Sequence, residues 1–150
     1  MKIKKIIFFF LLIAFVGIQF IPTSRNQSKE VLETDFTKTF DMPSNIQNLF
    51  KNSCYDCHSN NTHYPWYNKI QPVSWFLENH IKDAKSELNL SEFGTYSTRR
   101  QKSKLKSIVN QVKDNEMPLL SYRLIHSDAK LSESDKKILI SWVNKVIDSL

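Results

Sequence analysis

Both cysteines of this 150-residue chain lie within one run of five residues, Cys54-Tyr55-Asp56-Cys57-His58. Positions i, i+3 and i+4 share one face of a helical turn, so the spacing predicts that Cys54, Cys57 and His58 point the same way. Two thiols followed at once by an imidazole are the attachment pattern of a c-type haem. In this interpretation the thiols form thioethers with the haem vinyl groups, and His58 is the proximal iron ligand.

Three other chemistries use closely spaced cysteines, and each is less favoured here. A thiol–disulfide exchange motif normally lies on a βαβ scaffold, which this sequence does not predict. Zinc needs a second compact pair of ligands, and His63 and His80 are not spaced like one. A structural disulfide between cysteines three positions apart closes almost no loop and would stabilise little.

The first 22 residues have the pattern of an export segment. Three lysines in residues 1–5 precede an apolar stretch, residues 6–21, that is broken only by Gly17 and Gln19. These sixteen residues give roughly 24 Å of helix, somewhat short of a ~30 Å hydrocarbon core. The length fits a signal peptide or a short membrane anchor. Residues 20–24 lack the small-residue pattern of a cleavage site, so we favour an uncleaved anchor.

The charge pattern predicts which side of the membrane the chain occupies. Flanking lysines hold an N-terminus in the cytoplasm, so we expect the remainder on the exported side, in a bacterial periplasm. Covalent haem attachment takes place there in bacteria. The net charge of +6 suits an acidic redox partner or an anionic membrane surface. A nucleic acid partner is not expected behind an export segment.

Beyond the export segment, the sequence predicts a polar linker over 23–40 and a helical domain over 41–150. Ser44 is expected to cap a short helix that leads into the cysteine pentad. Pro72 is expected to begin a second helix, and a third is expected over 97–113. Ser132 and Asp135 resemble a capping box before a last helix with a regular apolar stripe. Only two glycines are present, no strand alternation is evident, and the predicted fold class is all-α.

The sixth iron ligand is predicted to be Met117. This methionine follows the proximal histidine by 117 − 58 = 59 residues and precedes Pro118, so it lies on a loop that can return over the haem. Thioether ligation raises the reduction potential relative to a second histidine. The alternatives are His80, His126 and His63, and Met117 as an ordinary loop or core residue.

Longer strings carry a family resemblance. Cys-Tyr-Asp-Cys-His-Ser-Asn-Asn-Thr-His-Tyr-Pro-Trp-Tyr, Pro-Val-Ser-Trp-Phe-Leu, Glu-Met-Pro-Leu and His-Ser-Asp-Ala-Lys-Leu-Ser together resemble the small bacterial haem-binding domain family, a variant of the cytochrome c group. The resemblance runs from about Phe40 to Val146. It implies one covalent haem c on Cys54 and Cys57 with His58 as ligand, and it places Met117 at the family's Met-Pro position.

These observations predict a cytochrome c-like domain that transfers single electrons on the exported side of the membrane. An electron carrier is favoured over an enzyme, because no Ser/His/Asp or paired-carboxylate site stands out. Two alternatives remain: a haem enzyme with an open or exchangeable sixth position, and a haem-based sensor or respiratory-complex subunit.

Overall fold

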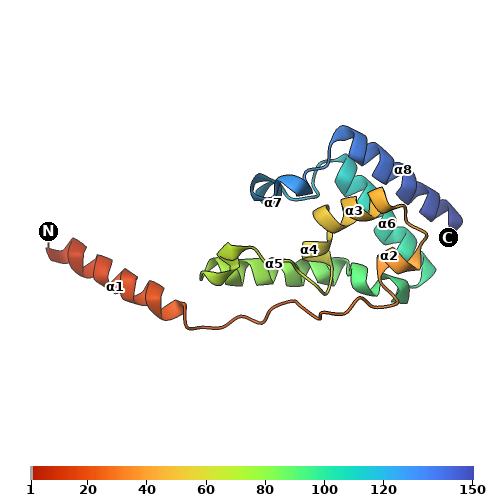
Figure 1. Ribbon diagram of the computed structural model, residues 1–150. Coiled ribbons are helices and arrows are strands. Elements are labelled where there is room, and N and C mark those ends of the chain that lie inside the picture. Colours follow the sequence, from red (N-terminus) through yellow and green to blue (C-terminus); the bar gives the residue numbers. More distant parts are fainter. Residues whose placement is uncertain (1) are drawn as a thin grey trace.

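The computed structural model describes residues 2–150, and its regular elements are all helical (Figure 1). Extended pairing in this range is limited to an isolated antiparallel bridge between Gln27 and Asn61. The predicted all-α class is therefore confirmed. The α-helices are α1 (Lys2–Ile18), α2 (Phe36–Thr39), α3 (Ser44–Ser53), α4 (Tyr55–His58), α5 (Val73–Glu87), α6 (Thr98–Lys113), α7 (Leu120–Ile125) and α8 (Glu133–Ser149), and the 3-10 helices are η1 (Trp66–Lys69), η2 (Leu90–Thr95) and η3 (Ser127–Ala129).

The capping box predicted for α8 is confirmed, whereas Pro72, predicted to be the first residue of its helix, is the N-cap of α5. The Ser97 hydroxyl accepts a hydrogen bond from the Arg100 amide at the start of α6, and Ser132 with Asp135 forms the predicted capping box of α8. The prediction for Ser44 was wrong. Pro43 occupies the N-cap of α3 and Ser44 is already helical, because the fixed φ of proline suits the entry to a helix as well as a serine cap does.

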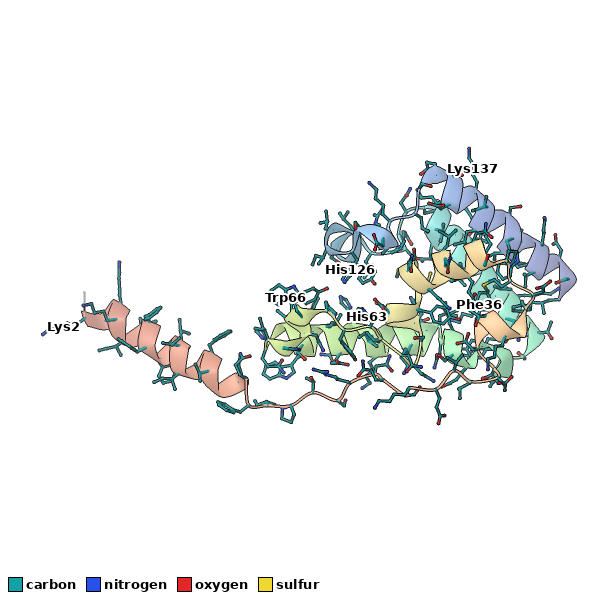
Figure 2. All side chains as sticks on the ribbon, viewed as in Figure 1. Lys2, Phe36, His63, Trp66, His126 and Lys137 are labelled. Carbon is teal, nitrogen blue, oxygen red and sulfur yellow. The ribbon has the colours of Figure 1, made fainter. Side chains whose placement is uncertain are left out.

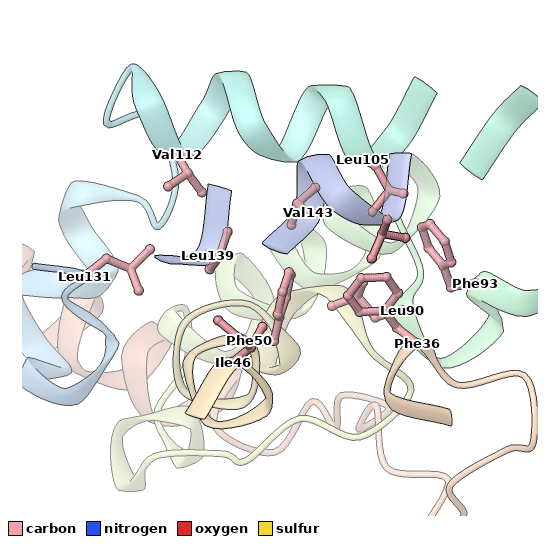
Figure 3. Packing of buried hydrophobic residues seen from close by; sticks show 11 residues of the cluster. Phe36, Ile46, Phe50, Leu90, Phe93, Leu105, Val112, Leu131, Leu139 and Val143 are labelled. Atoms are coloured by element: carbon pink, nitrogen blue, oxygen red, sulfur yellow. The ribbon is translucent and has the colours of Figure 1, made fainter. Parts of the chain in front are cut away.

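The apolar core joins α2, α3, η2, α6 and α8 (Figure 3). Phe36 has no exposed surface, and its ring centroid lies 5.0 Å from that of Phe50 and 4.8 Å from that of Phe93. The apolar stripe predicted for the last helix, α8, faces this cluster through residues such as Val143, and α6 contributes Leu105. The core therefore forms a block beside α4, the helical turn that contains His58.

The segment predicted to be a linker is packed against the domain. The Asn26 side chain donates to the Ser59 carbonyl (2.7 Å) and to the Thr62 hydroxyl (2.9 Å). Further along, Phe36 belongs to the core, so the packed domain begins before residue 41. Periodicity does not reveal this contact, because polar side chains and backbone groups form most of it.

Helix α1 projects away from the rest of the molecule, and its apolar side chains are exposed (Figure 1). Within residues 2–150, no helix has both the length and the apolar character that crossing a membrane requires. The predicted membrane anchor therefore gains no support from the structure. Just after α1, the Gln19 side chain donates to the Gln71 carbonyl (3.1 Å) and accepts from the Gln71 amide (2.9 Å). These bonds fix the end of α1 to the start of α5.

Candidate haem site

The cysteine pentad takes the one-turn helical conformation that its spacing predicts. Cys54 lies between α3 and α4, and the His58 amide donates to the Cys54 carbonyl (2.9 Å). Both cysteines are free thiols. The turn packs against the C-terminal half of α5, which determines the orientation of the His58 ring.

The His58 ring is held by the end of α5. Its Nδ1 atom lies 3.0 Å from the Ala84 carbonyl and 3.1 Å from the Leu88 carbonyl. Carbonyl oxygens only accept, so Nδ1 must carry the proton and Nε2 must carry the lone pair. Burial lowers the pKa of His58, which favours the neutral ring. A neutral imidazole with Nδ1–H fixed by a backbone carbonyl is the form that binds iron through Nε2.

The two thiols are not set up as reactive thiolates. Burial, with a smaller contribution from Cys57, raises the pKa of Cys54 to about 12. Burial, followed by the Asp56 carboxylate, raises the pKa of Cys57 to about 11. Disulfide-exchange cysteines have a lowered pKa, so the environment of this pair argues against that alternative. For zinc, residues 2–150 offer no group of three or more His, Cys, Asp or Glu side chains arranged to hold a metal ion.

Two neighbouring hollows lie beside the pentad and share the residues Asp56, His63, Tyr122 and His126. The inner hollow, of about 10 Å³, is also lined by Cys57 and by apolar residues of α5, Leu77 and Ile81. The outer hollow is open and holds about 380 Å³, within the range of cofactor pockets. His63 and Trp66 lie on one side of this region and His126 lies on the other (Figure 2).

Asp56, between the two cysteines, joins the walls of these hollows. Its Oδ2 atom accepts a hydrogen bond from the Tyr122 hydroxyl of α7 (2.6 Å), and its Oδ1 atom accepts from the His63 amide (3.0 Å). His126 stacks on Tyr122, with 4.1 Å between ring centroids. Sequence reasoning missed Asp56 and Tyr122, because a variable position of Cys-x-x-Cys-His gives no signal of its own.

The chemistry of the surrounding side chains fits a haem. Large apolar side chains stay exposed on the two sides of the site, including Trp66 of η1 (74%) and Leu124 of α7 (76%). A porphyrin is large and apolar, so a bound haem would bury apolar side chains of this kind. Arg123 of α7 has a buried Nε atom without a hydrogen-bond partner, and a guanidinium N–H suits the carboxylate of a propionate. The two thiols and the oriented imidazole are the donors that would hold a haem here.

The predicted sixth ligand does not line either hollow. Met117 is half-buried on the loop between α6 and α7, where its amide donates to the Gln111 carbonyl (3.1 Å). Of the alternative ligands, His63 and His126 line both hollows. His80 is exposed and lies edge-on to Phe76. The structure therefore brings Cys57, His63 and His126 together, and ligation by Met117 stays a prediction.

These features define an all-α protein with an oriented histidine and two thiols on one turn beside an open pocket. The model of the haem-binding domain family matches residues 13–145, so this chain belongs to the haem-binding domain family. The resemblance predicted from the sequence is thereby confirmed. Comparisons with curated proteins and with solved structures gave no match.

Proposed function

We propose that this haem-binding chain attaches one haem covalently through Cys54 and Cys57 and transfers single electrons. Each thiol would add across one vinyl double bond. Sulfur bonds to one vinyl carbon and a proton goes to the other, so no oxidant is consumed and no group leaves. The iron of the bound haem would supply the one-electron redox change. The chain's own residues would orient the ligand, bury the ring and limit water.

The observation that carries this proposal is the orientation of His58. The Ala84 and Leu88 carbonyls accept from its Nδ1–H, so Nε2 carries the lone pair that a metal would need. The neighbouring thiols are uncharged at neutral pH because their pKa values are raised. A pair of neutral thiols beside a fixed imidazole serves covalent haem attachment better than redox exchange or zinc binding.

We further propose that the domain is exported and acts on the periplasmic side of a bacterial inner membrane. The three lysines at the N-terminus and the exposed apolar surface of α1 support this location. The hydrogen bonds between Gln19 and Gln71 attach the end of this segment to the domain, which supports a segment that is not cleaved off after export. The electron partner would be a protein, and the surplus of basic residues suits an acidic one.

The covalent link can be tested on full-length protein matured in a host with working haem-attachment machinery. Haem should remain with the polypeptide on denaturing electrophoresis and give a pyridine haemochrome spectrum of the thioether type. The Cys54→Ala, Cys57→Ala double variant should lose it. His58→Ala should impair attachment, while His80→Ala should not, because His80 is exposed and lines neither hollow. Wild-type protein without covalent haem would rule out the proposal.

A haem enzyme is the second candidate. Met117 lines neither hollow, whereas His63, His126, Tyr67 and Tyr122 line the inner one. Acid–base side chains beside an exchangeable iron position would suit peroxidase-like chemistry. The visible spectrum separates the two functions. A low-spin six-coordinate spectrum supports electron transfer, whereas a high-spin spectrum that changes with peroxide or carbon monoxide supports the enzyme.

A further inference from the structure

Helix α7 is not held in place by burial of its own side chains. None of its six residues, Leu120–Ile125, is buried. Leu120, Leu124 and Ile125 are 63%, 76% and 65% exposed. Since burial of apolar surface normally fixes a short helix to its domain, other contacts must position α7.

Polar contacts supply this attachment. In the described part of the chain, two side-chain hydrogen bonds join residues 120–126 to elements distant in sequence. The Tyr122 hydroxyl donates to Asp56 Oδ2 at 2.6 Å, and the Tyr67 hydroxyl lies 3.5 Å from His126 Nε2. The first is short and has a charged acceptor, so it is the stronger of the two. Burial and Asp56 both raise the pKa of Tyr122, so its hydroxyl keeps the proton that it donates.

The other end of the bond lies inside the haem-attachment turn. Asp56 is directly before Cys57, and its second carboxylate oxygen accepts from the His63 amide (3.0 Å). One side chain therefore links α4, the loop after the pentad and α7. The loop that contains Met117 leads directly into α7, so the position of that loop depends on the same bond.

We propose that Asp56 is a positioning residue of the haem site, which anchors α7 and the adjoining Met117 loop through the Tyr122 hydroxyl. This inference rests on the proposed covalent haem. A turn bound to the haem at Cys54 and Cys57 cannot shift freely, so the anchor fixes α7 relative to the cofactor. Loss of the Asp56–Tyr122 hydrogen bond would leave the haem in place and admit water on the side of α7.

The test uses full-length haem-loaded protein and the variants Tyr122→Phe and Asp56→Asn. Tyr122→Phe removes a single hydroxyl and retains the aromatic ring that stacks on His126. The matched control is Tyr55→Phe, which breaks a similar bond of 2.7 Å from Tyr55 to Asp35 Oδ1 on the opposite side of the pentad. Three quantities are measured: covalent haem content, amide hydrogen exchange of residues 119–126, and the midpoint potential.

We expect Tyr122→Phe to retain covalent haem and to exchange the amides of residues 119–126 about ten- to a hundredfold faster. The midpoint potential should fall, because water stabilises the more highly charged ferric state. Asp56→Asn should act in the same direction, and the double variant should add little. Tyr55→Phe should change neither the exchange in 119–126 nor the potential.

Two results would overturn the inference while leaving the proposed function intact. One is haem-loaded Tyr122→Phe protein with wild-type exchange and potential. The other is an equal effect of Tyr55→Phe, which would indicate general loosening of the pentad. Wild-type protein without covalent haem would overturn the proposed function, and this inference with it.

Discussion

The two residues between the cysteines each take part in a tyrosine–aspartate hydrogen bond, in opposite chemical roles. Tyr55 donates to Asp35 at 2.7 Å, and Asp56 accepts from Tyr122 at 2.6 Å. The turn that contains the pentad is thereby tied to the N-terminal segment on one side and to α7 on the other. The one-turn conformation of the pentad could be predicted, because its spacing is a local pattern. The Asp56–Tyr122 pair could not, because its members lie 66 positions apart.

The assignment of Met117 as the sixth ligand gives a prediction at this scale. Met117→Ala should lower the midpoint potential by on the order of 0.1 V, within the roughly 0.8 V that axial ligands span. It should also remove the methionine–iron charge-transfer band. Potentiometric titration and visible spectroscopy of the loaded protein measure both effects.

Met42→Ala is the matched control, because Met42 is also half-buried but packs against the core cluster. Its spectrum should equal that of the wild type. An unchanged spectrum in Met117→Ala would transfer the role to a histidine. His63 and His126 would then be the first to test, since both line the two hollows.

At the scale of the element, the helices of ten or more residues in the domain could be predicted, and shorter ones outside the pentad were missed. Helices α6 and α8 combine a serine cap with apolar residues that face the core. Helix α7 was missed because six residues, Leu120–Ile125, are too few to establish a helical period. Helix α2 has four residues, which is too short for a period to be visible.

The capping box of α8 gives a prediction for this scale. Ser132 accepts from the Asp135 amide (3.1 Å), and the Asp135 carboxylate accepts from the Ser132 amide (3.0 Å). Ser132→Ala should lower the free energy of unfolding by about 1 kcal/mol. Urea unfolding followed by circular dichroism measures it. Ser134→Ala is the control and should have almost no effect, because Ser134 is exposed and lies inside the helix.

The same capping box predicts that its contribution to the free energy of unfolding depends on pH. Hydrogen bonds from the Ser132 side chain and backbone lower the pKa of Asp135 below its ordinary value of 3.8. A carboxyl group whose pKa is lowered by folding stabilises the folded protein at pH values above its ordinary pKa. This stabilisation is lost as the pH falls through the lowered pKa. The stability difference between wild type and Ser132→Ala should therefore shrink below about pH 4. An equal difference at neutral and strongly acidic pH would contradict this assignment.

At the scale of the whole molecule, the N-terminal segment is part of the folded unit. It runs along α5 and the loop after the pentad before it enters the core at Phe36 (Figure 1). The sequence predicted the domain but not this attachment. Amide and hydroxyl side chains that bond to backbone groups leave no hydrophobic pattern, whereas the contact of α6 with α8 does.

A substitution at Asn26 tests the polar part of the attachment of the N-terminal segment. The Asn26 side chain donates to the Ser59 carbonyl and the Thr62 hydroxyl, and both partner residues are buried. Asn26→Ala leaves these buried acceptors without a donor, so stability should fall by about 2 kcal/mol. Asn48→Ala on the exposed side of α3 is the control and should stay within about 0.5 kcal/mol of the wild type. Equal stabilities of the two variants in urea unfolding would contradict a fixed segment.

A substitution at Phe36 tests the apolar part of the attachment of the N-terminal segment. Its effect on stability distinguishes a folded segment from a free linker. The Phe36 ring has no exposed surface and contacts Phe50 and Phe93, from α3 and η2. Phe36→Ala leaves a cavity among three elements, so it should lower the free energy of unfolding by about 3–5 kcal/mol. Phe20→Ala removes a ring that is 82% exposed and should have little effect on the same unfolding curve. If both variants unfold with the wild-type midpoint, the segment is a linker and the core is complete without it.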